Sequence, residues 1–532
     1  MSQPFGLSCR GGLNTNLNQF DMLAQPGFAT ILRNFEVDPD GGYRRINGYT
    51  PFGGDSATRP IDDSKILGVY PYGEGVVVVV GTNIYYSDEG ISWIQVNKDT
   101  GHAGLTETAL ASATVLPRVN QGQAQFSIMK SPTAHSSTIY GSLSIATGPN
   151  KLGHFHIEGT GASRIFAYEE ISTPAAAKYV EEHDKHLCIV DTTNAPSTVY
   201  FSKTNDDRDF TGTGAGSVTI SDRINGIKSF RGSLFIFCEN TIHRLDDING
   251  TPSVVQITNN VGCLSGYSIQ EIGGDLLFLA PDGIRTIAAT QRIGDVELGS
   301  VSRQIQSIIS DLSTQINTYT ISSVVLRNKS QYRLFYSAEG SNIQTARGVI
   351  GTFTPNGFEW SETQGIQALS VNAGFASDGV DKVYHGDNLG YIYNHDSGSS
   401  FIQDETLQNI EATYQTPNLD FGDAGTLKTI QYVKISISPE GLTQPTLRVR
   451  YNYEDTLIPQ PPDYVLDQIQ TPAIFGVSEF GVAFFGGSLD PMVRQAVQGS
   501  GFASSFKISS NDQLPSYAIN GLYIDYMPSG RR

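Results

Sequence analysis

The sequence has few charged residues and few cysteines, and both shortages narrow the classes of protein to which it can belong. Charged residues make up 17% of the chain, below the roughly 25% of a typical soluble domain. The four cysteines form no C-x-x-C pair, which argues against a zinc or redox centre. We expect Cys188, Cys238 and Cys263, which lie in or beside apolar runs, to be buried free thiols, as suits synthesis in a reducing cytosol.

Long hydrophobic runs and an excess of basic residues are also missing. Unbroken apolar runs such as Val76–Val80 are too short to cross a bilayer, so we expect no membrane insertion by this chain. The first twenty residues contain no apolar core of a secretory signal. The formal net charge is −18. This balance argues against a surface that grips nucleic acid, because such surfaces neutralise phosphates with lysine and arginine.

Common catalytic motifs are absent as well. The sequence has no G-x-S-x-G elbow, no phosphate-binding G-x-x-x-x-G-K-[ST] loop, no H-E-x-x-H and no dinucleotide-binding glycine pattern after a strand. These absences argue against common hydrolases, nucleotidases and dehydrogenases. We therefore predict no enzymatic activity, no catalytic, metal or cofactor-binding residues, and no cofactor.

What the chain has is many turn formers and many aromatics, with 56 Gly, 25 Tyr and 26 Phe. Short β-branched and aromatic runs recur between Gly, Asp and Asn, and the units begin at Gly73, His183, Arg231, Gly273, Asn328 and Gly379. The last four start roughly 40–55 residues apart, the period of four-stranded propeller blades. The pattern predicts an all-β chain with a six- or seven-bladed β-propeller; a β-solenoid or a string of sandwiches is the alternative.

The pattern changes after residue 400, where strands alternate apolar and polar residues. Val433, Ile435 and Ile437 share one face of such a strand, which is typical of an antiparallel β-sandwich with one solvated face. We therefore predict an N-terminal docking segment at 1–60, a propeller at 61–402 and a C-terminal antiparallel β-sandwich at 403–532. The propeller also contains the single convincing helical pattern, at 296–312.

One short motif resembles the Asp-box of sialidase-type propellers. Ser87, Asp88, Gly90 and Trp93 stand in the stretch SDEGISW, one residue shorter than the Asp-box outline. We expect a structural hairpin turn in which Asp88 caps backbone N–H groups, Gly90 supplies a positive φ and Trp93 packs beneath. Such a turn carries no chemistry.

Three groups of polar residues have the spacing of metal ligands, and each has a plainer interpretation. They are His154, His156 and Glu158; His183 and His186; and Asp207, Asp209 and Gly212. We expect a solvated strand face for the first, a polar turn before an apolar strand for the second and an Asp-rich turn for the third. In the third, the place of the bidentate Glu of a calcium loop is taken by Val218.

Three stretches together resemble the nozzle or tail-hub proteins of short-tailed bacteriophages, also called packaged-DNA stabilisation proteins. They are PGFATILRNFEVDPDGGYRRINGYTPFG at 26–53, VGCLSGYSIQEIGGDLLFLAPDGIRTI at 261–287 and GSGFASSFKISSNDQLPSYAINGLYIDYMPSGRR at 499–532. They occur in the family's order from one end of the chain to the other. The third stretch resembles endings of phage structural proteins that pack against a neighbouring subunit.

This resemblance implies a structural protein of the virion tail, made in the host cytoplasm. It implies a homo-oligomeric, hexameric ring that docks on the phage connector or adaptor and contacts other tail proteins such as fibres. Viral DNA would be retained and ejected through the ring without specific binding. Candidate subunit-interface residues are Arg44, Arg45, Arg531 and Arg532.

Two alternative functions stay open at this point. Related proteins are also expected at the neck, the baseplate or the head surface of a virion. A carbohydrate-binding or carbohydrate-cleaving propeller would instead carry a cleft lined by carboxylates and aromatics such as Trp360.

Overall fold

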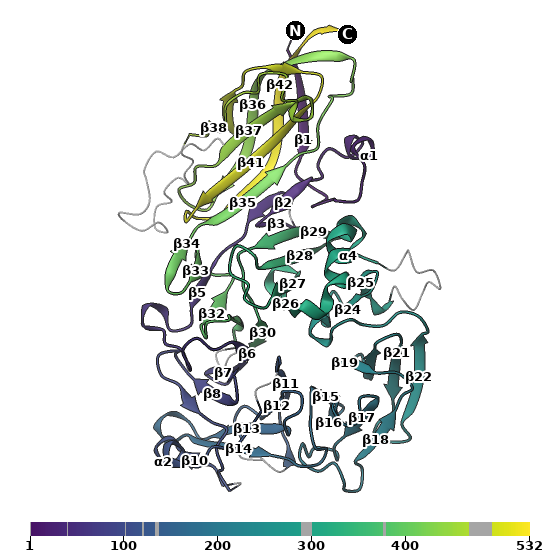
Figure 1. The fold of residues 1–532 in the computed structure, drawn as a ribbon, viewed down its shortest axis with the longest axis vertical. Helices are drawn as coiled ribbons and strands as arrows, with labels where there is room; N and C mark the ends of the chain where they lie inside the picture. Colours follow the sequence, from purple (N-terminus) through teal and green to yellow (C-terminus); the bar gives the residue numbers. More distant parts are fainter. Residues whose placement is uncertain are drawn as a thin grey trace.

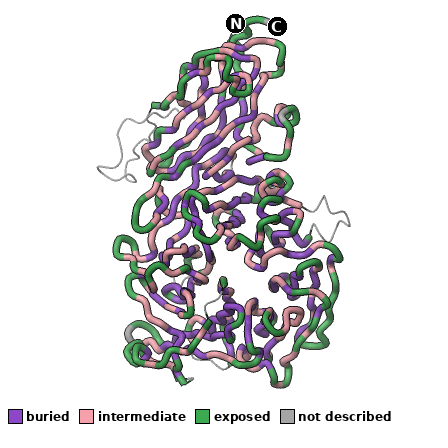
Figure 2. Tube along the Cα trace, viewed as in Figure 1, coloured by how far each residue is buried: buried purple, intermediate pink, exposed green. Residues whose placement is uncertain are grey.

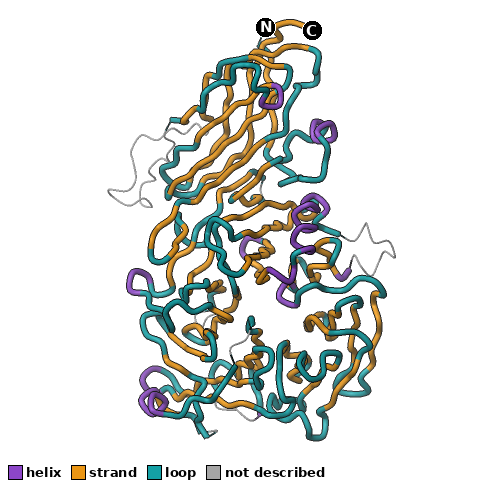
Figure 3. Tube along the Cα trace, in the orientation of Figure 1, coloured by secondary structure: helices purple, strands orange, loops and turns teal. Residues whose placement is uncertain are grey.

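A computed structural model describes residues 2–39, 41–101, 103–119, 122–133, 138–288, 300–375, 379–467 and 492–531. The molecule is elongated, with a ring of small sheets at one end and two packed sheets at the other (Figure 1). Both termini lie at the tip of the packed sheets. Strands dominate throughout and the helices are short (Figure 3).

Six small antiparallel sheets form most of the ring. In chain order, the first three are β6–β9 (Ile66–Tyr72, Gly75–Val80, Asn83–Ser87, Ile94–Gln95), β10–β14 (Leu105–Thr106, Gln125–Met129, Ser142–Ala146, Gly153–Glu158, Ile165–Glu170) and β15–β18 (Tyr179–His183, His186–Val190, Thr198–Phe201, Gly216–Thr219). The others are β19–β22 (Ile224–Phe230, Ser233–Cys238, Ile242–Asp246, Ser253–Thr258), β23–β25 (Gln270–Ile272, Asp275–Ala280, Gly283–Thr286) and β30–β32 (Ser370–Phe375, Asp381–Gly386, Ile392–His395). The last is completed by β5 (Tyr49–Pro51), which pairs with β32.

A further four-stranded segment completes the ring. Strands β26–β29 (Tyr319–Leu326, Gln331–Ala338, Arg347–Thr354, Gly357–Gln364) are the first part of a nine-stranded sheet. Strand β26 contacts both β23 and β30, so this segment lies between the sheets to which those strands belong. The predicted all-β propeller with a C-terminal sandwich is therefore confirmed, with six free-standing sheets in the ring and one segment shared with the sandwich.

The second strand of the first blade shows why the apolar runs fold in this way. Every residue of β7 is buried, and Val76, Val77, Val78 and Val80 are fully inaccessible to solvent. A blade packs between two neighbours, so its central strands are covered on both faces and their sequences need not alternate. The unbroken apolar run in the sequence therefore indicates a strand that is covered on both faces.

The sandwich packs a seven-stranded sheet against the second half of the nine-stranded sheet. The seven strands are β1 (Gln3–Ser8), β3 (Phe35–Val37), β4 (Tyr43–Arg45), β36 (Thr426–Pro439), β39 (Met492–Ala496), β40 (Ser500–Gly501) and β42 (Tyr517–Arg531). The facing strands are β2 (Ile31–Arg33), β35 (Ile410–Gln415), β37 (Thr446–Tyr451), β38 (Tyr464–Val465) and β41 (Ser504–Asp512). As expected, Val433, Ile435 and Ile437 are buried and alternate with less buried residues along β36. The strands of the sandwich in Figure 2 show buried and less buried residues in alternation.

The N-terminal segment is built into both parts of the molecule. Strand β2 joins the propeller to the sandwich by pairing in parallel with β29 and antiparallel with β35. Strand β4 pairs with β42, and β5 closes the last blade. One hydrophobic cluster accordingly extends from Leu522 and Ile524 in the sandwich to Leu277 and Leu279 in the blade β23–β25.

The helical prediction is met in part. A short 3-10 turn at Arg303–Ile305 leads into α4 (Gln306–Thr314), and residues 296–299 lie outside the described residues. Ile305, Ile309 and Leu312 are buried, as the periodicity indicates. The other α-helices described are α1 (Gln19–Leu23) and α2 (Glu107–Ser112). Among the described residues, no helix has the length and apolar character needed to cross a membrane.

Candidate binding channel

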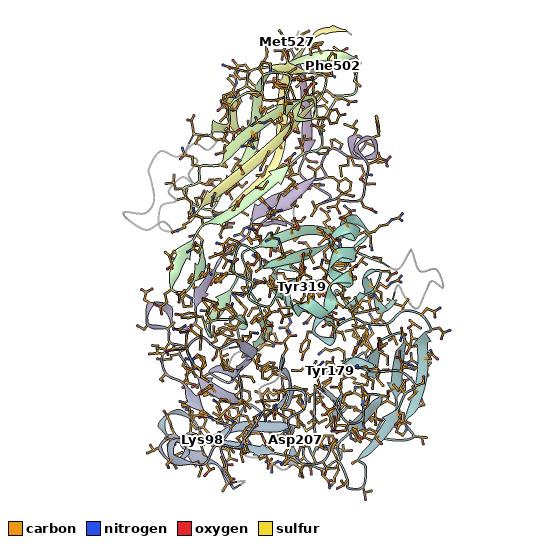
Figure 4. All side chains as sticks on the ribbon, in the orientation of Figure 1. Lys98, Tyr179, Asp207, Tyr319, Phe502 and Met527 are labelled. Atoms are coloured by element: carbon orange, nitrogen blue, oxygen red, sulfur yellow. The ribbon has the colours of Figure 1, made fainter. Side chains whose placement is uncertain are left out.

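The innermost strands of the ring surround a cavity of about 410 Å³. Seven strands line it, namely β6, β11, β15, β19, β23, β26 and β30. Figure 4 marks Tyr179 and Tyr319, the first residues of β15 and β26. Much of the lining is polar, because the inner strands carry side chains such as Gln125 and Ser127 that bond to the backbone of the next blade.

Many of these polar side chains hold neighbouring blades together. Gln125 Oε1 and Ser127 Oγ on β11 accept hydrogen bonds from the backbone N–H groups of Val180 and Glu182 on β15, at 3.1 and 2.8 Å. Glu181 continues the pattern by accepting from the N–H of Ser229 on β19 at 3.2 Å. The inner strands of neighbouring blades do not pair with each other. The side-chain bonds therefore satisfy backbone N–H groups that would otherwise lack a hydrogen-bond partner.

The same device operates on the other side of the ring. Gln270 Nε2 on β23 donates to the carbonyl of Ser323 on β26 at 2.9 Å. Asn372 Nδ2 on β30 donates to the carbonyl of Val69 on β6 at 2.8 Å, which links the last blade to the first. The polarity of the channel is therefore in large part structural.

One end of the cavity is closed by Gln123. Its Nε2 donates to the carbonyl oxygens of Ile321 and Leu369, at 2.6 and 2.7 Å, and its own carbonyl accepts from the Tyr267 hydroxyl at 2.6 Å. A second cavity of about 560 Å³, lined among others by Lys65, also has Gln123 in its wall. Among the described residues, Gln123 therefore lies between the two cavities and obstructs the propeller axis.

The first cavity carries charged groups and an aromatic pair. Lys228 forms an ion pair with Glu181 at 2.8 Å, and Arg327 pairs with Asp381 at 2.8 Å. The Tyr70 ring stacks on Phe126 with centroids 5.3 Å apart. Burial raises the pKa of Tyr70, while the nearby Lys228 ammonium opposes this shift.

A second polar cluster, the junction network, lies where the propeller meets the N-terminal segment. The buried Arg333 guanidinium on β27 donates to Glu36 at 2.8 Å and to Asp396 at 3.0 Å. Lys329 pairs with the same two carboxylates, at 3.0 and 2.6 Å. A buried arginine between two carboxylates has its charge matched, which buried charges require.

Two histidines extend the junction network into the last blade. Arg333 can only donate, so His395 Nε2 accepts its hydrogen bond at 3.1 Å. His395 Nδ1 then carries the proton and donates to His385 Nδ1 at 3.3 Å. Burial lowers the pKa of His385 to about 3, and burial together with the Arg333 charge lowers the pKa of His395 well below its usual value. Both imidazoles are therefore neutral.

The candidate interface arginines lie in different surroundings. Arg45 is fully buried, forms an ion pair with Asp512 at 3.0 Å and donates to the carbonyls of Leu514 and Asp512. It has no exposed surface with which to reach a neighbouring chain. Arg44 pairs with Glu36 and Glu440 and keeps some exposure. Arg531 ends β42, its side chain is not described, and Arg532 lies outside the described residues.

The Asp-box-like turn uses its residues differently from the expectation. Ser87 Oγ, not Asp88, accepts from the backbone N–H, that of Gly90 at 2.8 Å. Asp88 accepts a hydrogen bond from the Tyr86 hydroxyl and forms an ion pair with Arg164, each at 2.6 Å. Arg164 belongs to the adjacent blade, so Asp88 links two blades. Gly90 has the predicted positive φ of 74°. Trp93 lies partly buried near Phe52.

The histidines read as a solvated strand face are in fact buried. His154 is fully inaccessible, and its Nδ1 lies 3.2 Å from Ser144 Oγ and 3.3 Å from Asp207 Oδ2. Asp207, marked in Figure 4, follows the next blade's third strand, so this contact ties two blades together. His156 lies 3.5 Å from Glu158, which is partly exposed.

The other two groups form local structure. His183 and His186 face each other across the β15–β16 hairpin, and both are buried; His183 Nδ1 lies 2.8 Å from Ser229 Oγ. They flank the expected polar turn, which Asp184 and Lys185 form, and are themselves buried because the next blade covers them. Asp209 accepts from the N–H groups of Thr211 and Gly212, which is the expected Asp-rich turn. Among the described residues, no three His, Cys, Asp or Glu side chains gather in a metal-binding arrangement.

Two further predictions concern single buried residues. Trp360 does not line a cleft; it is fully buried in β29 and donates to the carbonyl of Val301 at 2.8 Å. Cys188, Cys238 and Cys263 are buried free thiols, as expected. Burial raises the pKa of Cys238 to about 12, which keeps this thiol protonated and unreactive.

The channel itself was not found from the sequence. Its signal is present, since Gln125 and Ser127 alternate with Phe126 and Ile128 in β11, the innermost strand of its blade. The sequence could not reveal which neighbouring blade each face of this strand meets. Gln123 stands in a loop whose path depends on distant strands.

Comparison with known proteins finds only remote structural similarities. No family model matches the chain, and no curated protein matches it. Similar solved structures include the extracellular domain of a putative hybrid two-component system from B. thetaiotaomicron, with 10% identity over 72% of this chain and 45% of that one, and a TM-score of 0.35. Raptor from Chaetomium thermophilum has 7% identity, with 66% and 29% covered and a TM-score of 0.37.

An exo-β-1,3-galactanase from Phanerochaete chrysosporium is similar over 90% of this chain and 99% of that one, with 8% identity and a TM-score of 0.26. The chain thus spans less than half the length of the first two chains, at 45% and 29%. At these identities and TM-scores, none of the three similarities carries an argument about activity or partners, and none of the three descriptions names a virion component.

Proposed function

We propose that this chain is a structural, non-enzymatic protein of a bacteriophage tail, which assembles into a homo-oligomeric nozzle ring, hexameric in our proposal, below the connector. The supporting observation is the arrangement of the stretches that resemble tail nozzle proteins. The stretch 26–53 supplies β2–β5 and the stretch 499–532 supplies β40–β42. The two pair directly, with Tyr43 of β4 opposite Ile519 of β42.

These two stretches also hold the molecule together. One strand of the first stretch closes the propeller and another joins the propeller to the sandwich. Family-specific segments are expected at the positions that define a fold. Their direct pairing is what a shared architecture with tail nozzle proteins would produce, and it supports the proposal.

The charge and the closed axis favour one route for DNA. Gln123 closes the propeller axis, so DNA would pass through the lumen between subunits and not through an individual propeller. A net charge of −18 suits a lumen wall that repels DNA and lets it slide. The ring would dock on a connector or adaptor and contact other tail proteins such as fibres.

One exposed edge offers surface for self-association. The outermost strand β22 has six residues, whereas β9, β18 and β5 have two, four and three. Its sequence SVVQIT carries no charge and no proline, and Val254 and Val255 are exposed. Proteins normally shorten or charge such edges to prevent pairing with another chain, so this unprotected strand fits a chain that assembles with copies of itself.

Immunogold electron microscopy of virus particles, with antibody raised against this chain, tests the proposal. Gold at the distal end of the tail is the expected result. Gold at the neck, the baseplate or the head surface would keep the structural class and overturn the nozzle position. If no particle is labelled while the antibody still detects the purified chain, the virion proposal is wrong.

A further inference from the structure

We propose that the cavity on the propeller axis, the channel chamber, binds a neutral sugar of one or two rings. The chamber is bounded by the inner strands and is closed at one end by Gln123. Its volume of about 410 Å³ falls within the roughly 300–1,000 Å³ of small-molecule sites. A blind chamber of this size admits a compact ligand and excludes a polymer that would have to pass through.

The aromatic pair supplies one wall for a sugar ring. Tyr70 and Phe126 stack with an interplanar angle of 28°, so Phe126 fixes the orientation of the Tyr70 ring. The hydrogen bonds recorded among the described residues leave the Tyr70 hydroxyl without a partner in this chain. A sugar presents apolar C–H groups, which pack on an aromatic face, beside hydroxyls, which can bond to the phenol oxygen.

The charges of the chamber select against anions. Its lining contains Glu181, Glu182 and Glu271 against Lys228 and Arg327, and Arg327 is already paired with Asp381. The uncompensated charge is therefore negative, which repels phosphates and acidic sugars. Carboxylate oxygens accept from hydroxyl groups and the cations donate to ring oxygens, so a neutral polyhydroxyl ligand satisfies both.

Saturation-transfer NMR on the purified full chain tests this inference, with glucose, galactose and N-acetylglucosamine as neutral probes and N-acetylneuraminic acid as the anionic one. We expect transfer to at least one neutral sugar and none to the anion. Replacing Tyr70 by Phe is expected to weaken binding about tenfold, as loss of one hydrogen bond predicts.

A blocking variant keeps the test sharp. Ala373 lines the chamber, so Ala373→Leu fills space there and is expected to abolish binding. Ala109→Leu adds the same atoms on the exposed face of α2 and is the matched control. Absence of transfer to every neutral sugar, binding that survives in Ala373→Leu, or preferential binding of the anion would each overturn the inference. None of these outcomes bears on where the chain lies in a virion.

Discussion

At the scale of single residues, Arg45 shows how an exposed-looking motif can be part of the interior. Its guanidinium is enclosed between β4 and the strand end at Asp512. Replacing Arg45 by Ala leaves buried carbonyls and a carboxylate without their donor, so we expect the free energy of unfolding to fall by about 3 kcal/mol. Urea unfolding measures this loss.

Arg244 provides the matched arginine control. Its side chain is 39% exposed and pairs with the partly exposed Asp246. Exposed ion pairs contribute about 1 kcal/mol or less, so Arg244→Ala is expected to change stability little. Equal losses in the two variants would contradict the buried role of Arg45.

His385 gives a prediction on pH at the same scale. Its folded pKa of about 3 lies below the value of 6.5 in the unfolded chain, so the unfolded state binds more protons between these values. His385 therefore does not reduce the free energy of unfolding above pH 6.5. As the pH falls from 6.5 toward 3, protonation of this residue in the unfolded chain lowers the free energy of unfolding progressively. Each pH unit in this window costs about 1.4 kcal/mol.

We therefore expect the free energy of unfolding of His385→Gln to fall less steeply than that of the unmodified chain as the pH drops from about 6 to about 4. The expected difference in slope is about 1.4 kcal/mol per pH unit. His395 acts in the same direction, while Asp387, whose pKa burial raises to about 6, acts in the opposite one; both remain in the variant. The readout is the slope, so a uniform loss of stability does not affect it. An unchanged slope would show that His385 is protonated in the folded chain.

At the scale of elements, β5 shows how an N-terminal strand closes a ring made from later sequence. It enters through Gly48, where an added Cβ would lie 1.8 Å from the carbonyl oxygen of Ser400. The approach is backbone to backbone, so Gly48→Ala is expected to displace β5 and lower the thermal midpoint by several degrees. Gly122→Ala is the control, because no atom lies within 4 Å of its added Cβ. A normal midpoint for Gly48→Ala would mean that the strand adjusts freely.

The elements also show what could be predicted from sequence. Alternation in β36 and the unbroken apolar run of β7 follow from how each strand is covered, so a local pattern was sufficient. The pairing of β4 with β42 joins residues nearly 500 positions apart along the chain, Tyr43 with Ile519. No local pattern encodes such a pairing, and the same holds for Gln123, whose partners are Ile321 and Leu369. The buried histidines were misplaced for this reason too, since only the neighbouring blade hides them.

At the scale of the whole molecule, the shared nine-stranded sheet makes the propeller and the sandwich one structural unit. The sheet runs from β26 to β38 without a break, and one hydrophobic cluster extends across it. Removal of β2 would expose the edge of β29 on the propeller side and the edge of β35 on the sandwich side. We therefore expect the two parts to unfold together, although a chain of 532 residues often unfolds in stages.

The two tryptophans of the chain allow this expectation to be measured. Trp93 lies beside the first blade, and Trp360 lies inside the shared sheet. In Trp93→Phe the remaining indole reports the shared sheet, and in Trp360→Phe it reports the first blade. In each variant we expect the fluorescence midpoint in urea to coincide with that of far-ultraviolet circular dichroism. The expectation would be contradicted if the indole of Trp360→Phe showed the first blade unfolding before the circular dichroism changes. The propeller and the sandwich would then unfold as separate bodies, although the N-terminal segment joins them.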